Sequence, residues 1–143
     1  MINQISVFLE NKPGTLNEMT AILAENKVDI RAFSLAETKD FGIARLIVND
    51  GYEAMNVLKE ADFVANFSPV LAFAIPDEPG GLNHLLQKFT DAKVNIEYMY
   101  ASLGGKDSDT AYMIFRVSDT RNSEAALIAT GLKPLSQEDI SEI

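Results

Sequence analysis

The chain has 143 residues, 47% of them hydrophobic and 23% charged, and this composition excludes disordered and collagen-like proteins. The absence of cysteine excludes disulfides, thiolate nucleophiles and cysteine-ligated metals, and a single histidine disfavours histidine-based metal or catalytic sites. The formal net charge of −9 has the wrong sign for nucleic acid or an anionic membrane, so we expect no nucleic-acid or membrane partner. We also expect no metal and no cofactor.

Residues 1–68 show strand-like and helix-like patterns in alternation. Alternating apolar residues predict strands, and apolar residues three or four positions apart predict helices. Thr15 and Glu18 have the spacing of a capping box, which predicts the start of the first helix. The predicted order is strand, helix, strand, strand, helix, strand, over residues 5–9, 16–23, 28–35, 43–48, 52–61 and 63–67.

The second half of the chain repeats the first after a shift of 66 residues. Asp-Glu-Pro-Gly-Gly-Leu-Asn at 77–83 aligns with Asn-Lys-Pro-Gly-Thr-Leu-Asn at 11–17, and 93–96 aligns with 27–30. The register then shifts by three residues, because the second copy has a longer turn at 104–109. The same order of elements follows, over residues 71–75, 82–89, 94–103, 111–117, 122–130 and 132–135.

Each half therefore reads βαββαβ, and its two helices must bury their apolar stripes against one face of an antiparallel sheet. This predicts an α+β fold of two ferredoxin-like βαββαβ sandwiches in tandem. We assign the domains to residues 1–68 and 69–143, with almost no linker between them. Pro134 weakens the last predicted strand, and the acidic tail at 136–143 is expected to be peripheral.

The turn between the first strand and first helix of each half is the candidate site. Gly14, and Gly80 with Gly81, place no side chain where the chain enters a helix. The free N–H groups and positive dipole end of a helix suit a small anion such as a carboxylate. A short polar residue, Asp29 or Asn95, lies between apolar neighbours at the start of strand two.

These patterns also have a structural interpretation. Pro-Gly between a strand and a helix is often turn chemistry only, and Asn95 can bond to its own backbone or cap a helix. Duplication of the turn at matching positions favours a functional role over a purely structural one. The ferredoxin-like fold alone does not decide it, because this fold has many unrelated functions.

The pattern Asn-x-Pro-Gly-x-Leu at 11–16, followed after one helix by Val-Asp-Ile at 28–30, resembles the ACT domain. Both segments recur in the second half, so the whole chain resembles a tandem pair. ACT domains are regulatory modules that bind free amino acids in amino-acid metabolism. The resemblance implies that the two modules pack side by side in one eight-stranded antiparallel sheet and bind amino acids at their interface.

The resemblance also implies two ligand pockets, each made by the turn of one module and the start of strand two of the other. The pockets combine Asn11, Pro13, Gly14, Thr15 and Leu16 with Asn95 and Ile96, and Asp77, Pro79, Gly80, Gly81 and Leu82 with Asp29 and Ile30. An asparagine amide offers a donor and an acceptor to a zwitterion, whereas ionised aspartate only accepts. We therefore expect the second pocket to be empty or to take a basic ligand.

We interpret the chain as a regulatory or sensor module that binds a free amino acid and is not an enzyme. It would act on a separate metabolic enzyme or simply bind its ligand. A dimerisation module without a small ligand is the alternative. An acylphosphatase-like enzyme is a weaker alternative, because it would require Arg31 and Asn95 to converge.

The location and assembly of the chain are also expectations. No segment approaches the ~18 uninterrupted apolar residues of a membrane span, and the start of the chain lacks the basic and apolar regions of a signal peptide. We therefore expect a cytoplasmic protein. Sheets with exposed edge strands tend to pair, which makes a homodimer the expected assembly.

Overall fold

The computed structural model describes residues 1–37, 39–105 and 107–143 and divides into two compact units. The first unit is Asn3–Ser68, and the second unit is Pro69–Ile143 together with Met1–Ile2. The ammonium group of Met1 lies 2.9 Å from the Glu124 carboxylate, which ties the first residue to the second unit.

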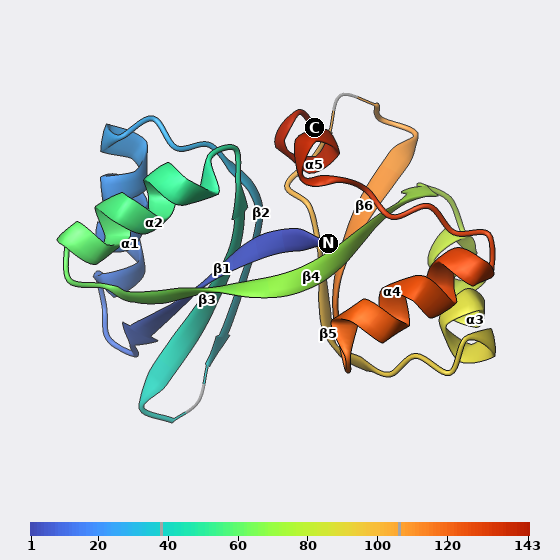
Figure 1. The fold of residues 1–143 in the computed structure, drawn as a ribbon. Helices are drawn as coiled ribbons and strands as arrows, with labels where there is room; N and C mark the ends of the chain where they lie inside the picture. Colours follow the sequence, from blue (N-terminus) through green and yellow to red (C-terminus); the bar gives the residue numbers. More distant parts are fainter. Residues whose placement is uncertain (38, 106) are drawn as a thin grey trace. The chain divides into compact units, whose positions relative to one another are not determined.

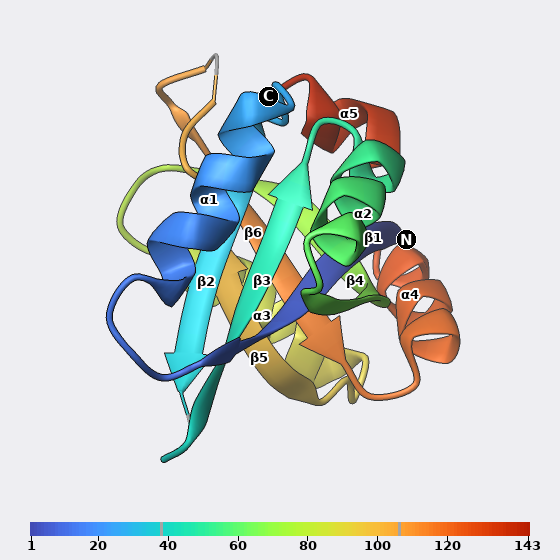
Figure 2. The ribbon, with the colours of Figure 1, turned by 90° about the vertical axis from the view of Figure 1, so that its left-hand side faces the viewer.

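The first unit is a sheet with two helices on one face. Its strands have the order β2-β3-β1-β4, with β3 antiparallel to both β1 and β2. Figure 2 shows α1 and α2 side by side over one face of these strands. The elements are β1 (Ile2–Glu10), α1 (Thr15–Glu25), β2 (Ile30–Glu37), β3 (Phe41–Val48), α2 (Gly51–Glu60) and the start of β4 (Val64–Pro76).

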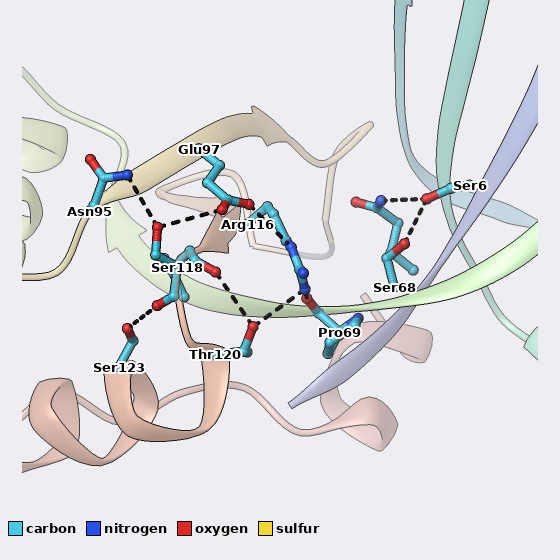
Figure 3. A network of polar contacts seen from close by, with 11 residues as sticks. Ser6, Ser68, Pro69, Asn95, Glu97, Arg116, Ser118, Thr120 and Ser123 are labelled. Carbon is cyan, nitrogen blue, oxygen red and sulfur yellow. Dashed lines mark hydrogen bonds and ion pairs between the residues drawn. The ribbon is translucent and has the colours of Figure 1, made fainter.

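The predicted apolar alternation forms the core of this unit. Ile5, Val7 and Leu9 of β1 point to the helices, where Met19 and Leu23 of α1 are buried with them. The other face of β1 carries two buried polar side chains, Gln4 and Ser6. The Gln4 amide donates to Ser6 Oγ at 3.0 Å, and the Ser6 and Ser68 hydroxyls lie 3.0 Å apart (Figure 3). Hydrogen bonding thus compensates the burial of these groups.

The second unit repeats this arrangement with strand order β4-β6-β5. In Figure 1, α3 and α4 lie on one side of these strands and α5 on the other. Three aromatic rings occupy the core, with centroids 4.6 Å apart for Phe89 and Phe115, 5.8 Å for Phe73 and Phe89, and 6.2 Å for Phe73 and Phe115. The remaining elements are α3 (Gly81–Asp91), β5 (Ile96–Ala101), β6 (Thr110–Val117), α4 (Thr120–Ala129) and α5 (Gln137–Ser141).

Among the described residues there are six strands, where eight were expected. The predicted strands 63–67 and 71–75 form one continuous strand, β4. The predicted strand 132–135 is not one, because Pro134 has no N–H to donate to a ladder. This segment contacts β4 through a hydrogen bond from the amide of Leu135 to the carbonyl of Ala72 at 2.8 Å. The expectation of an eight-stranded sheet is not met.

The acidic tail also differs from expectation. It forms the short helix α5, and Ile140 is fully buried, so the tail is part of the second unit. Ser136 and Asp139 form a capping box, with the Asp139 amide 3.1 Å from Ser136 Oγ and the Ser136 amide 2.8 Å from Asp139 Oδ2.

We expect this capping box to weaken in acid. The Ser136 amide, the Ser136 hydroxyl and the charge of Lys133 hold the pKa of Asp139 below its usual value. The stabilisation is therefore complete above the ordinary aspartate pKa of ~3.9 and is lost as the pH falls through the lower pKa of the folded state. The amide proton shift of Ser136, followed by NMR, should report this transition. Asp139→Asn should abolish it and Glu138→Gln should retain it, and an unchanged transition in Asp139→Asn would contradict the assignment.

Candidate functional site

Two matching turns enter α1 and α3. Gly14 and Gly80 are the N-caps of these helices, with φ of 89° and 87° in the left-handed region that favours glycine. No side chain caps either helix. The predicted capping box at Thr15 and Glu18 is therefore wrong: Thr15 is the first residue of α1, and its hydroxyl donates to the carbonyl of Lys12 at 3.3 Å. The uncapped first-turn N–H groups remain suited to an anion.

The two turns differ in how closely the backbone packs. A Cβ at Gly81 would lie 2.3 Å from the carbonyl oxygen of Pro76, so only glycine fits there. Thr15 occupies the matching position of the first turn. The second turn is therefore tighter than the first.

The polar residues at the start of each turn are held by their own unit. The side-chain Nδ2 of Asn11 donates to the carboxylate of Glu37 in β2 at 3.2 Å. The backbone N–H of Asn11 donates to the carbonyl of Asp40 at 3.3 Å. The Asp77 amide donates to the carbonyl of Asp109 at 2.8 Å. Pro13 and Pro79 are exposed, Leu16 packs on the core of the first unit, and Leu82 is exposed.

The start of strand two differs between the units. The Asp29 amide donates to Asn49 Oδ1 at 2.8 Å, which leaves the Asp29 carboxylate to form an ion pair with Arg31 at 2.8 Å. Asn95 instead uses its side chain, donating to Ser118 Oγ at 3.2 Å (Figure 3). The sequence analysis named Arg31 only for an acylphosphatase-like enzyme and did not predict its ion pair with Asp29, although the two charges stand two positions apart in the strand.

Two of the predicted site residues belong to the cores. Ile30 packs against the apolar cluster of the first unit and Ile96 against that of the second. Both are partly buried on the helix-covered face of their sheet. Their main role is to anchor the strand that carries Asp29 or Asn95.

No unit brings its own turn and its own strand start together. In the first unit, the turn at Gly14 precedes α1, and Asp29 follows the other end of this 11-residue helix, about 16 Å along its axis. The second unit has the same order around α3. The pairing of residues 11–16 with 95–96, and of 77–82 with 29–30, stays a prediction.

Each unit contains a cavity. In the first, a cavity of about 500 Å³ lies between α1 and the start of β2, and Asp29 and Ile30 line it. In the second, a cavity of about 740 Å³ contains none of the predicted site residues. Its lining consists of Phe73, Ala74, Thr110, Tyr112, Gly131, Leu132, Lys133, Pro134, Leu135, Asp139, Glu142 and Ile143. The cavity beside Asp29 is therefore the one that coincides with the sequence prediction.

Within residues 1–37, 39–105 and 107–143, no three His, Cys, Asp or Glu side chains are grouped so that they could hold a metal ion. None of the described helices is long and apolar enough to cross a membrane.

The turns, the strand starts and the repeated βαβ order can be compared with known families. A family model described as an ACT domain pair matches residues 1–143. The chain belongs to the ACT domain pair family. This family is regulatory and not catalytic, which supports a ligand-binding regulatory role for this ACT domain pair.

Solved structures agree with this assignment. Protein BT0572 from Bacteroides thetaiotaomicron is 33% identical, with a TM-score of 0.89 over 99% of this ACT domain pair and 96% of that chain. The ligand-free regulatory subunit of aspartate kinase from Thermus thermophilus is 18% identical, with a TM-score of 0.66 over 90% of each chain. At 18% identity, the similarity to this regulatory subunit shows a shared fold and nothing more. A search of curated proteins found no match.

Proposed function

We propose that this ACT domain pair binds a free amino acid at the interface of two modules, residues 1–68 and 69–143, and that binding regulates a separate metabolic enzyme. The proposal takes the protein to be a cytoplasmic homodimer. The observation that carries it is the duplicated uncapped helix N-terminus behind a left-handed glycine, at Gly14 and at Gly80. The match to the ACT domain pair family, which is regulatory and not catalytic, supports the regulatory part of the proposal.

The chemistry of the proposed pockets fits an amino-acid zwitterion. The uncapped N–H groups at the start of α1 and α3 would donate hydrogen bonds to the ligand carboxylate. Asp29 or Asn95, at the start of strand two, would accept hydrogen bonds from the ligand ammonium group. Binding between the modules would favour one arrangement of the two modules over another. A coupling free energy of about 1–3 kcal/mol between ligand binding and this arrangement is enough for regulation.

Thermal unfolding tests the proposal. The protein is unfolded and refolded to remove co-purified ligand, and each standard L-amino acid is then added separately. A ligand that binds only the native state should raise the melting temperature by about 5–10 °C at a concentration a hundred times its Kd. No shift with any amino acid would contradict the proposed function and favour the dimerisation module.

A paired set of variants tests the location. Asn95→Ala combined with Asp29→Asn should remove the shift, because both strand starts lose their proposed ligand contacts. Asn83→Ala, an exposed asparagine on α3, is the control and should keep the full shift. A shift that survives the double substitution would contradict the site assignment and leave the amino-acid function standing.

A further inference from the structure

The second unit differs from the first at the position of its fourth strand. Residues 64–67 of the first unit begin β4, and Ala65 and Phe67 pack there against the core. The repeat, with its shift of 66 residues enlarged by the three of the longer turn, places residues 133–136 opposite them, and these form no strand. Residues 131–135 instead line a cavity of about 740 Å³ together with residues of β4 and β6. The second unit thus has a cavity where the first unit has a packed strand.

Two other features that distinguish the second half from the first also border this cavity. One is the longer turn at 104–109: a Cβ at Gly105 would lie 2.6 Å from the ring of Tyr112 and 3.0 Å from Ile143, which both line the cavity. The other is the tail helix α5, which is held by the buried Ile140 and places Glu142 at the cavity. The longer turn, the lost strand and the tail helix therefore meet at one place.

The walls of the cavity are largely apolar. The rings of Phe73 and Tyr112 and the side chains of Leu132, Leu135 and Ile143 line it. Its volume of about 740 Å³ lies in the range of small-molecule sites, which combine apolar walls with a few polar groups that fix the orientation of the ligand. These walls suit an aryl or alkyl body.

The polar groups of the cavity leave one negative charge uncompensated. Lys133, Asp139 and Glu142 are its charged side chains. The Ser136 amide, the Ser136 hydroxyl and then the charge of Lys133 lower the pKa of Asp139, so Lys133 already faces an opposite charge. Within the described part of the chain, the Glu142 carboxylate and the Tyr112 hydroxyl have no hydrogen-bond or ion-pair partner. Both offer oxygen atoms that can accept from a ligand.

We propose that this cavity binds an organic monocation with an apolar body, such as an arylalkylamine. The ammonium group of the ligand donates to the Glu142 carboxylate and the Tyr112 hydroxyl, and its body packs against Leu132 and Leu135. The net charge of −9 favours the approach of a cation over that of an anion. The site is independent of the proposed amino-acid pockets, because the cavity contains none of the residues assigned to them.

An NMR titration of the full chain tests the charge of the ligand with three probes that share one body. The probes are phenethylamine, 2-phenylethanol and 3-phenylpropionate. Phenethylamine should shift the backbone amide signals of Tyr112 and Leu135 and bind about two- to fivefold tighter than the alcohol, the gain expected for an exposed ion pair. The acid should bind most weakly. Equal or tighter binding of the acid would overturn the inference, and so would the absence of any shift with phenethylamine.

Two variants and a control test the location. Glu142→Gln, a nearly isosteric change at an exposed residue, should lower the affinity for phenethylamine to that for the alcohol. Glu138→Gln removes the same charge from an exposed residue of α5 outside the cavity lining and should keep the preference. Ala74→Leu should weaken binding of all three probes by filling the cavity from β4. A preference for the amine that survives in Glu142→Gln, or full binding in Ala74→Leu, would overturn the assignment.

Discussion

Phe115→Ala is expected to lower the free energy of unfolding of this ACT domain pair by about 3–5 kcal/mol. Phe115 is fully buried and contacts the rings of Phe73 and Phe89 in the core of the second unit. Truncation removes apolar contacts and leaves a cavity between β4, β6 and α3, which the two remaining rings cannot fill. Urea denaturation followed by circular dichroism measures the change, because the chain has no tryptophan for fluorescence.

Phe41→Ala is the matched control for this prediction. Phe41 is 44% exposed and lies on β3 of the first unit, so its truncation should cost less than about 1 kcal/mol. An equal loss of unfolding free energy in the two variants would contradict the prediction that the aromatic cluster is the main stabilising contact of the second unit.

Gly81→Ala is the second substitution with a large expected effect. Its Cβ would lie 2.3 Å from the carbonyl oxygen of Pro76, and that oxygen already accepts from the Glu78 amide at 3.0 Å. Because the Pro76 oxygen and the Glu78 amide that donates to it both belong to the backbone, neither can rotate away, and the turn itself must move. We expect a loss of about 1–3 kcal/mol in unfolding free energy, measured by urea denaturation, and the loss of any ligand binding that uses this turn.

Two neighbouring substitutions separate the clash from backbone strain. Gly80→Ala meets nothing within 4 Å, so its cost, about 1–2 kcal/mol, is the strain of a positive φ alone. Thr15→Ala, at the position of the first turn that matches Gly81, should cost less than about 1 kcal/mol. A Gly81→Ala variant as stable as Thr15→Ala would contradict the close packing of the second turn.

Features with a local cause were predicted well. Alternation and helical spacing predicted the helices α1 to α4 and the strands other than the one expected at 132–135, because each of these elements buries one face of its own. The Pro-Gly turns were predicted because positive φ at Gly14 and Gly80 is a property of the residue itself. The buried rings of Phe73 and Phe89 lie within the predicted strand 71–75 and the predicted helix 82–89.

Features that depend on distant neighbours were missed. The helix cap at Thr15 failed because the turn geometry makes Gly14 the N-cap. The tail forms α5 because Ile140 finds a buried place in the second unit, which no local pattern shows. The buried Arg31 Nε, which has no hydrogen-bond partner among the described residues, was also invisible, since residues on other strands decide which donors are satisfied.

The sequence by itself determined the duplication, the family and the two candidate turns, because repeats and glycine positions are written along the chain. The tertiary structure alone decided how Asp29 and Asn95 differ. Asn49 bonds the Asp29 backbone and leaves its carboxylate to Arg31, whereas Ser118 binds the Asn95 side chain and continues to Glu97 and Arg116. The physical reason is that a hydrogen-bond partner comes from a neighbouring strand, and only the folded chain shows which polar groups are left without one.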